Sequence, residues 1–459
     1  MKKSLSNLPS LFISILLATW GTVIWATDAN MDTDEDGISD EEEVMLGYNP
    51  SVTTRIIYVN GSRPDDNGDG LTEASAKKTI KGGVDAAKVA NVENIVIVAP
   101  GTYLGAENRE ISFGGFNIKL KTSHGAGQTI VDLQKQGIFL RVKNRESKAE
   151  SILDGFTIKN GYGTSGGAIE VSNSSGLQIK NCVFRDNSVS YSGGALYLSS
   201  SDVNIENTKF LNNRYKSSEP YSPPESGGGA IYISGGTYHF KSSEFLSNSG
   251  ISGGAINVSG SGTLILDSCI FRNNQATSGG ALYMAYFTNI TLENCLILNN
   301  TADYYGFMNV EYESTLTIRH STISGNSSRS SSDLSISGTT NIYNTIFSGS
   351  YSGTPTTITA SCMSQDSSAY GTNNISVDPK LTPLGFLKSD SPCIDAGSAD
   401  YAIPKDLSGQ TRPVGTAPDI GCYEYLDTDN DGIPDNVELA AGMNPNDPSD
   451  ANGDIDNDG

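Results

Sequence analysis

The chain has 459 residues, of which 37% are hydrophobic and 18% charged. Its net charge of −22 comes mostly from residues 32–43, with eight acids, and residues 427–458, with ten, and neither stretch contains Lys or Arg. Nucleic-acid binding is disfavoured because no basic face dominates the chain. The many Gly, Ser, Asn and Thr residues favour short strands joined by tight turns.

Residues 1–26 have the pattern of a secretory signal peptide. Lys2 and Lys3 precede an uncharged, mostly apolar run from residue 11 to Ala26, where a small residue suits cleavage. A membrane anchor is the alternative, but the run is short for a span and an acidic segment follows it. No later segment of the sequence is predicted to cross a bilayer as a helix. A secreted or bacterial cell-surface protein is therefore expected.

Residues 28–50 contain the pattern of a twelve-residue calcium loop. Acids at alternate positions and a central glycine wrap oxygen atoms around one ion, and Ca²⁺ prefers six to eight oxygen ligands. An acidic, solvated linker is the alternative. The expected ligands are the side chains of Asp32, Asp34, Asp36, Asp40 and Glu43 and the backbone carbonyl of Ile38.

Residues 57–103 contain three features in order: Tyr-Val-Asn-Gly, an Asp-Asp-Asn-Gly-Asp-Gly loop at 65–70, and the run Ile-Val-Ile-Val-Ala-Pro-Gly-Thr-Tyr at 95–103. This segment resembles the opening of many parallel β-helices. The resemblance implies that residues 74–90 form a short helix that caps the first coil.

A block of about 26 residues then repeats, beginning with Gly-Gly-Ala and ending with Phe/Ile-x-x-Asn. A period of this length is typical of a solenoid, in which each repeat buries its apolar face against its neighbours. One longer gap, of 35 residues, contains an insertion at 214–226. The Gly-Gly-Ala steps begin at Gly166, Gly193, Gly228, Gly253 and Gly279, and the Asn steps end at Asn187, Asn213, Asn248, Asn274, Asn300 and Asn326.

Aligned on these asparagines, the blocks predict the environment of each column. Positions three and eight residues before the Asn are apolar and are expected inside, as is the column of Cys182, Cys269 and Cys295. The position seven before is always charged, with mostly alternating sign, and is expected to face solvent. The Asn itself is expected at a turn, where it tolerates a left-handed conformation and its amide reaches neighbouring coils.

The Gly-Gly-Ala-Ile and Phe-x-x-Asn steps resemble the repeats of chlamydial polymorphic outer membrane proteins. Those proteins belong to the right-handed parallel β-helix, or pectate-lyase-like, class. The resemblance implies an all-β, right-handed parallel β-helix solenoid over residues 55–375, with about 26 residues per coil. Unlike those proteins, the given sequence does not end in a membrane barrel.

Residues 376–425 are expected to be an irregular region that closes the β-helix. Ser-Pro-Cys-Ile-Asp-Ala-Gly from Ser391 and Asp-Ile-Gly-Cys-Tyr-Glu-Tyr up to Tyr425 resemble the end of choice-of-anchor β-helix domains, which are bacterial surface modules. Cys362, Cys393 and Cys422 permit one disulfide, and the sequence does not choose the pair.

Residues 426–459 repeat the calcium pattern. Each loop is followed by Gly-x-Asn-Pro, a tail that resembles thrombospondin type 3 and dockerin-like repeats. A third loop starts at Asp454 and is cut at Gly459, so the full protein is expected to continue. The expected Ca²⁺ ligands here are Asp427, Asp429, Asp431, Ile433, Asp435 and Glu438.

β-Helix enzymes that cleave acidic polysaccharides need a Lys or Arg base beside Ca²⁺ held by carboxylates. The outward column two residues after each repeat Ala has no Lys or Arg and one acid, so no catalytic residue is assigned. Arg141, Lys143 and Arg145 alternate, and Lys143 lies about one coil from Glu170. An ordinary basic face with a cross-coil ion pair is the favoured interpretation, and a lyase is the alternative.

Tyrosines in the same column suggest a ligand face, since sugar rings stack on aromatic side chains. The alternative is that Tyr is favoured in strands for its packing. We therefore expect a secreted, calcium-binding surface protein that acts in adhesion or binds a polysaccharide or cell-surface glycan, with a uronate polysaccharide lyase and a structural spacer as alternatives. The candidate ligand residues are Tyr197, Tyr232 and Tyr283 in the column and Tyr215 and Tyr221 in the insertion.

Overall fold

The structure is a computed structural model that describes residues 31–143, 151–215, 227–285 and 287–450. The predicted signal peptide, Arg145, Tyr221 and the third acidic loop lie outside these residues. The chain divides into two compact units, one formed by the N-terminal residues up to Thr54 with Asn91–Glu93, the other by Arg55–Ala90 and the chain from Asn94 onward.

The first unit holds an acidic loop and one short helix, α1 (Asp40–Leu46). The helix begins after Ser39, whose side chain accepts the N–H of Glu42, and it ends at Gly47 in the left-handed conformation that glycine adopts without strain. The N–H of Glu93 donates to the carbonyl of Thr53, which fastens the end of the unit.

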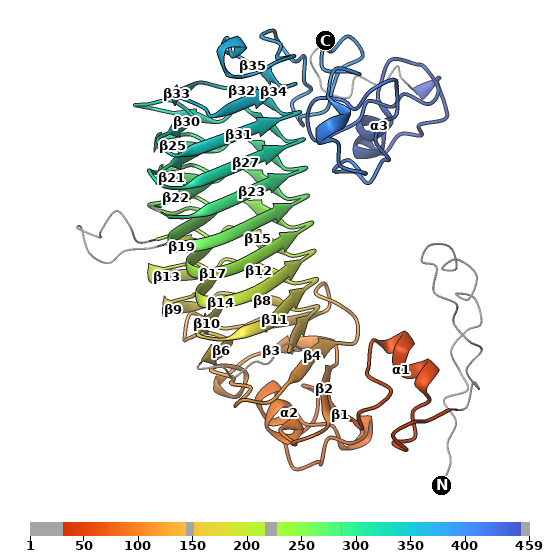
Figure 1. The fold of residues 1–459 in the computed structure, drawn as a ribbon. Helices are drawn as coiled ribbons and strands as arrows, with labels where there is room; N and C mark the ends of the chain where they lie inside the picture. Colours follow the sequence, from red (N-terminus) through yellow and green to blue (C-terminus); the bar gives the residue numbers. More distant parts are fainter. Residues whose placement is uncertain (1–30, 144–150, 216–226, 286, 451–459) are drawn as a thin grey trace. The chain divides into compact units, whose positions relative to one another are not determined.

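The second unit is a right-handed parallel β-helix (Figure 1), which confirms the predicted fold class. Paired residues in successive coils are typically 26 apart in sequence, and 35 apart across the insertion. Within the described residues, the first and largest sheet has 18 strands and is named here sheet A. Its strands are β1 (Thr54–Val59), β2 (Glu93–Val98), β4 (Ile118–Thr122), β6 (Leu140–Lys143), β7 (Ile152–Asp154), β10 (Ile169–Ser172), β11 (Ser175–Lys180), β14 (Leu196–Glu206), β17 (Ile231–Lys241), β19 (Ile256–Asp267), β22 (Leu282–Met284), β23 (Asn289–Glu293), β26 (Met308–Val310), β27 (Thr315–Arg319), β30 (Leu334–Ile336), β31 (Thr339–Tyr343), β33 (Tyr351–Gly353) and β34 (Thr357–Thr359).

In the part of the chain that the structure describes, the second sheet, named sheet B, has 11 strands, and two further sheets have three strands each. Sheet B contains β3 (Gly101–Tyr103), β5 (Thr129–Asp132), β8 (Thr157–Lys159), β12 (Val183–Arg185), β15 (Lys209–Leu211), β18 (Glu244–Leu246), β20 (Ile270–Arg272), β24 (Leu296–Leu298), β28 (Thr322–Ser324), β32 (Ile346–Ser348) and β35 (Cys362–Met363). The small sheets contain β9 (Tyr162–Ser165), β13 (Ser188–Ser192) and β16 (Arg214–Tyr215), and β21 (Gln275–Ser278), β25 (Thr301–Tyr304) and β29 (Ser327–Ser328).

The repeat asparagines form a buried ladder along the coils. The amides from Asn187 to Asn300 each donate to the side-chain carbonyl of the Asn in the next coil, at 2.8–3.1 Å. All six, including Asn326 at the end of the ladder, also donate to a backbone carbonyl of the preceding coil, as Asn274 does to Phe245. The predicted contact between coils is therefore present. The left-handed residue is not this Asn but its predecessor, with φ of 53–64° at Asn212, Ser247, Asn273, Asn299 and Gly325.

The interior of the β-helix is one continuous apolar core. Phe184, Phe210, Phe245 and Phe271 stack from coil to coil, with ring centroids 4.5–5.2 Å apart. Cys182, Cys269 and Cys295 are buried in the same core, as expected. Repetition of one side chain at one coil position thus lets each ring pack against the same ring in the next coil.

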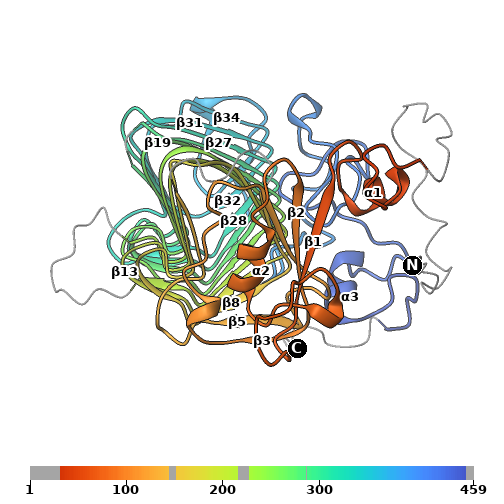
Figure 2. The same ribbon diagram turned by 90° about the horizontal axis from the view of Figure 1, so that it is seen from below.

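The predicted capping helix is shorter than residues 74–90. A 3₁₀ turn, η1 (Glu73–Ser75), precedes α2 (Ile80–Ala87), which begins after Thr79. Ile80, Val84 and Ala87 of α2 are buried in the β-helix core, and Figure 2 shows α2 across the end of the coils. The 3₁₀ turn η2 (Ala106–Asn108) follows β3.

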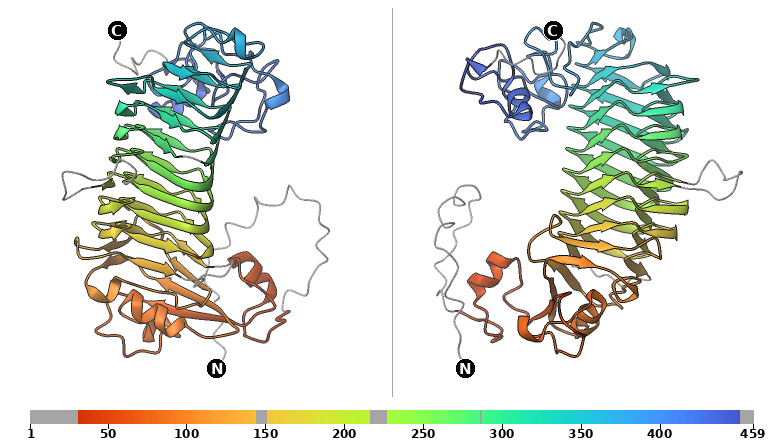
Figure 3. Two further views of the ribbon diagram at one scale, coloured as in Figure 1. Left: turned by 60° about the vertical axis from the view of Figure 1, so that its left-hand side comes forward. Right: turned by 180° about the vertical axis from the view of Figure 1, so that it is seen from behind.

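Residues 376–425 lie beside the last coils (Figure 3). They contain η4 (Ala399–Tyr401), follow η3 (Ser368–Tyr370), and precede α3 (Asp435–Ala441). Outward residues of sheet B that are apolar in these coils are buried under this region. These residues are Leu296 and Leu298, which pack with Phe386 and Tyr423, and Ile346, which packs with Leu387 and Ile420.

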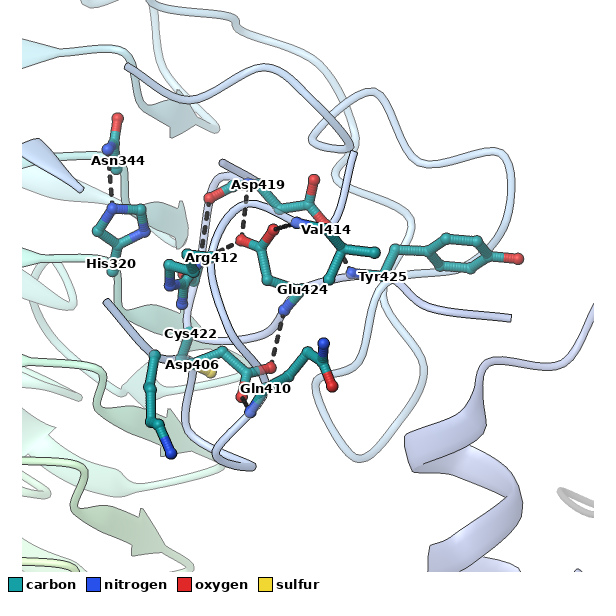
Figure 4. Close-up of polar contacts among 12 residues, drawn as sticks. His320, Asn344, Asp406, Gln410, Arg412, Val414, Asp419, Cys422, Glu424 and Tyr425 are labelled. Atoms are coloured by element: carbon teal, nitrogen blue, oxygen red, sulfur yellow. Dashed lines mark hydrogen bonds and ion pairs between the residues drawn. The ribbon is translucent and has the colours of Figure 1, made fainter. Parts of the chain in front are cut away.

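A buried polar cluster fastens the same region to the coils (Figure 4). Arg412 and Glu424 are fully buried and form an ion pair at 2.6 Å, and the second amino group of Arg412 donates to Asn294 in the β-helix. The carboxylate of Glu424 also accepts the N–H groups of Val414 and Asp419. Hydrogen bonds to both members thus support the buried ion pair, while Nε of Arg412 has no hydrogen-bond partner among the described residues.

Within the described residues, no helix has both the length and the apolar character needed to span a membrane.

Candidate metal centres and ligand face

In the N-terminal loop, the carboxylates of Asp32, Asp34 and Asp36 lie within 4.8 Å of one another. The loop curls because Gly37 donates its N–H to Asp32 at 2.9 Å and Ile38 donates to Asp36 at 2.8 Å. Gly37 has φ of 93°, a conformation that other residues rarely adopt. The sequence pattern thus produces a compact turn lined by acids.

Glu43 of α1 is buried in this unit. One of its carboxylate oxygens accepts the hydroxyl of Thr54 at 3.0 Å, whereas Oε2 is buried without a hydrogen-bond partner among the described residues. Burial raises the pKa of Glu43, and the charges of Asp34 and Asp36 raise it further. The backbone N–H of Thr54 also occupies Oδ2 of Asp36, at 2.6 Å.

The C-terminal loop repeats this geometry, and Asp427, Asp429 and Asp431 form the corresponding triad. Glu438 of α3 is buried, and burial, followed by the charges of Asp429 and Asp431, raises its pKa to about 7. A further acid, Asp450, lies within 4.8 Å of Asp431 and Glu438. Buried oxygens without a partner in the described chain are Oδ1 of Asp427, Oδ2 of Asp429, Oδ2 of Asp431, both of Glu438 and Oδ1 of Asp450.

Buried carboxylate oxygens that face one another without a hydrogen-bond donor fit a hard divalent cation. Ca²⁺ takes six to eight oxygen ligands and offsets the repulsion among the acids. The two loops differ in how many oxygens they offer, because Thr54 occupies oxygens in the first and Asp450 adds one in the second. The carbonyls of Ile38 and Ile433 remain predicted ligands.

Asp40 and Asp435 are not brought into these carboxylate clusters, although the sequence predicts both as ligands. The two oxygens of Asp40 accept the N–H and the hydroxyl of Thr33, both at 2.7 Å. Asp435 accepts the same two groups of Thr428 at 2.7 and 2.6 Å. Each carboxylate therefore fixes the start of its loop to the following helix.

The predicted tyrosine column lies on sheet A. Tyr197 and Tyr232 are paired in register and stack, with centroids 5.5 Å apart and ring planes 6° apart. Stacking covers part of a face of each half-buried ring, and the pair remains a predicted ligand face. Asn257 separates Tyr232 from Tyr283, and Tyr215 lies in another sheet, next to Gly227.

The basic residues that precede this column are held by carboxylates. Arg141 pairs in register with Glu170, and both its guanidinium and the ammonium of Lys143 contact Glu170, the latter at 2.6 Å. Arg141 also contacts Glu110 at 3.0 Å. This arrangement fits the favoured interpretation of cross-coil ion pairs.

A pocket of about 360 Å³ opens beside this charge network. Its lining includes Glu110, Arg141, Tyr162 and Glu170. Tyr162 is 44% exposed, and Glu170 is 8% exposed and pairs in register with Tyr197 in the next coil. The pocket therefore combines an accessible aromatic ring with planar charged groups at the end of the tyrosine column.

Sequence reasoning missed Asp450, Glu110 and Tyr162. Asp450 lies outside the twelve-residue loop pattern, and Glu110 comes from a segment before the regular repeat, so neither has a periodic signal. Tyr162 stands four residues before a Gly-Gly-Ala-Ile step, outside the outward column.

The model of the right handed beta helix region matches residues 115–221 and 216–375, more than half of the chain. The chain belongs to the right-handed β-helix proteins. The model of the bacterial TSP3 repeat matches residues 32–51 and 427–448, which are the two acidic loops with their helices. Together with the Asp triads, these repeats suggest a calcium site at each end of this β-helix protein.

Solved structures resemble this β-helix protein at low identity. Pectate lyase Pel9A is 15% identical with a TM-score of 0.48, covering 87% of this chain and 100% of its own. A rhamnogalacturonan lyase is 13% identical with a TM-score of 0.44, covering 85% and 100%. PfbA, a surface adhesin of Streptococcus pneumoniae, is 13% identical with a TM-score of 0.31, covering 66% and 87%. These values transfer no activity or ligand to the present chain.

No curated protein sequence matches the chain.

Proposed function

We propose that this protein is a secreted, calcium-binding β-helix of the bacterial cell surface that acts in adhesion by binding a glycan. Export rests on the signal-like residues 1–26, and the resemblance of residues 391–425 to choice-of-anchor domains supports a surface role. The observation that carries the glycan proposal is the pocket beside Arg141 and Tyr162. Its lining residue Glu170 pairs in register with Tyr197, which stacks on Tyr232.

The chemistry of this surface suits a sugar. The apolar face of a pyranose ring packs on an exposed aromatic ring such as that of Tyr162. Carboxylates accept hydrogen bonds from neighbouring sugar hydroxyls, and a guanidinium donates hydrogen bonds to them. A pocket of this size lies within the range of small-molecule sites. Because Arg141 and Lys143 are matched by Glu110 and Glu170, the surface favours a sugar without a strong net charge.

The same ion pairs weigh against the lyase alternative. A general base needs a lone pair directed at the substrate proton, whereas Arg141 and Lys143 both direct donors at Glu170. A purely structural spacer accounts for the coils and the calcium loops but gives no role to the pocket.

The decisive experiment exposes the full chain, loaded with Ca²⁺, to a glycan array and separately to uronate polysaccharides. Retention on the array without cleavage supports the proposal. Ultraviolet absorbance from unsaturated products supports the lyase alternative. If the chain is neither retained on the array nor active on the polysaccharides, the structural spacer is supported.

A variant series locates the binding surface. Replacing Tyr197 and Tyr232 together by Ala is expected to abolish retention, while the melting temperature changes little. Replacing the same two residues by Phe keeps the stacked rings and controls for folding. Tyr312→Ala changes an exposed tyrosine outside the column and is expected to bind normally. Unaltered retention by the double Ala variant would refute a role for this face.

A further inference from the structure

Cys362 and Cys393 meet where the C-terminal region covers the last coils. Cys362 lies in β35 and pairs in register with Ile346 of β32. Cys393 belongs to the segment that resembles choice-of-anchor domains, and its carbonyl accepts the N–H of Ile420. Both cysteines are buried, at 1% and 0% exposure, in one apolar cluster with Ile346, Leu387 and Ile420.

The two side chains are neighbours within this buried cluster. Both are free thiols in the structure, and each shifts the pKa of the other, because the neighbouring Cys393 lowers the pKa of Cys362 and Cys362 raises the pKa of Cys393. The sulfur of Cys362 also lies 3.4 Å from the carbonyl oxygen of Val377. Cys422, the third cysteine outside the repeats, lies in a different cluster with Leu296, Leu298 and Phe386. The fold therefore selects one pair among the three that the sequence leaves open.

We propose that Cys362 and Cys393 form a disulfide that fastens the C-terminal region to the last strand of sheet B. The proposal rests on export, because disulfides persist in oxidising compartments. In the reaction, each thiol loses its proton, one S–S bond forms, and the two electrons reduce the disulfide of a thiol–disulfide exchange oxidant to two thiols. Because both sulfurs are buried in the folded chain, the exchange takes place during folding, before the cluster closes.

The bond would close the stretch of chain between residues 362 and 393. This stretch contributes Ile375, Leu381 and Leu387 to the cluster that it encloses. Restricting the unfolded chain over such a loop stabilises the folded state. The disulfide and the Arg412–Glu424 ion pair thus fasten the two ends of the C-terminal region.

Peptide mapping of the full chain tests the pairing. The chain is exported through its own signal segment, denatured without reductant in an excess of alkylating agent, digested and examined by mass spectrometry. A linked pair of peptides that contain Cys362 and Cys393, with the other four cysteines alkylated, is expected. Alkylation of both, or a link from either to Cys422, would overturn the proposal.

A second arm separates this proposal from the question of export. The full chain is unfolded, reduced and refolded in a glutathione redox buffer, and the same peptides are mapped. The same linked pair supports the geometry even if export is wrong, and refolded protein in which both thiols are alkylated refutes it.

The fastening role has its own readout. Reductant is expected to increase hydrogen exchange in residues 376–425 of the linked protein. Reductant should not change hydrogen exchange in the variant with Cys362→Ser and Cys393→Ser. In the Cys422→Ser control, reductant should still increase the exchange of residues 376–425. Equal exchange with and without reductant in the linked protein would contradict the role.

Discussion

His320 is a buried side chain whose surroundings require the neutral imidazole. Asn344 holds its own amide in a fixed orientation, because its Oδ1 accepts the N–H of Ser398 and its Nδ2 donates to the carbonyl of Ser398, both at 2.8 Å. The same Nδ2 lies 2.9 Å from Nε2 of His320, which must therefore accept and carry no proton (Figure 4). Burial, then the charge of Arg412, lowers the pKa of His320 to about 3.

This ionisation makes stability depend on pH. Below the ordinary pKa of 6.5, the unfolded chain binds a proton that the folded chain refuses until about pH 3. His320 therefore does not lower the free energy of unfolding above pH 6.5, where it is neutral in both states. Below pH 6.5 it makes the free energy of unfolding fall with decreasing pH, by at most about 1.4 kcal/mol per pH unit. His320→Asn, the residue found at the equivalent positions 294 and 344, should remove this loss.

Urea unfolding at pH 7 and pH 5 measures the effect. Between these values the parent chain should lose about 2 kcal/mol more than His320→Asn. The exposed His124→Asn variant is the control and should follow the parent. The same pH dependence in His320→Asn and the parent would contradict a neutral, buried His320.

Asp450 gives a second prediction at this scale. Because its Oδ1 is buried without a partner next to Asp431 and Glu438, Asp450→Asn should weaken Ca²⁺ binding at the C-terminal loop by roughly tenfold, or about 1.4 kcal/mol. Calorimetry in a chain with the N-terminal loop inactivated by Asp34→Ala isolates this site. Asp447→Asn, whose carboxylate accepts a bond from Ser449, is the control, and equal affinities of the two variants would exclude Asp450 as a ligand.

The loop motif identified the acids at fixed spacing because their role depends on neighbours within twelve residues. It did not separate Asp40 from the triad, since the bonds from Thr33 that engage its carboxylate depend on how the loop folds back. Asp450 could not be predicted because it reaches the site from beyond the helix.

Among the structural elements, the Asn ladder joins successive coils through buried side-chain hydrogen bonds. Asn274 satisfies its whole amide inside the protein, because its oxygen accepts the N–H and the amide of Asn248 and its nitrogen donates to Phe245 and Asn300. Removing a partner leaves buried groups without hydrogen bonds, which costs more than the bonds themselves contribute.

Asn274→Ala should therefore lower the free energy of unfolding by about 2–4 kcal/mol, measured by urea unfolding. Asn273→Gly is the matched control, because Asn273 is left-handed with φ of 57° and Gly325 occupies the equivalent position two coils later. The control should change stability by less than about 1 kcal/mol. If the two variants were equally stable, the ladder would not be a stabilising element.

The 26-residue period predicted the coils because every coil buries the same columns against its neighbours. It placed the left-handed turn one residue late, since Asn is suited both to that conformation and to an inward amide ladder. Apolar residues at outward positions of sheet B, such as Leu296 and Ile346, signal the covering C-terminal region, but a single column with mixed character does not reveal what covers it.

For the molecule as a whole, the repeat specifies a scaffold and the departures from the repeat carry the chemistry. The coils account for the fold without a catalytic set in the outward column of sheet A. The acidic loops and the C-terminal region lie outside the 26-residue pattern, and the pocket beside Arg141 lies where the pattern begins. The repeat in the sequence therefore predicts the fold far better than it predicts the function.

Calcium binding by the full chain is the most direct test of the account. After removal of divalent ions with a chelator, calorimetric titration with Ca²⁺ should show binding at both loops, at or below the roughly millimolar range of extracellular modules. Glu438→Gln should remove the C-terminal site and leave the N-terminal one. No heat of binding and no change in melting temperature up to millimolar Ca²⁺ would contradict the account.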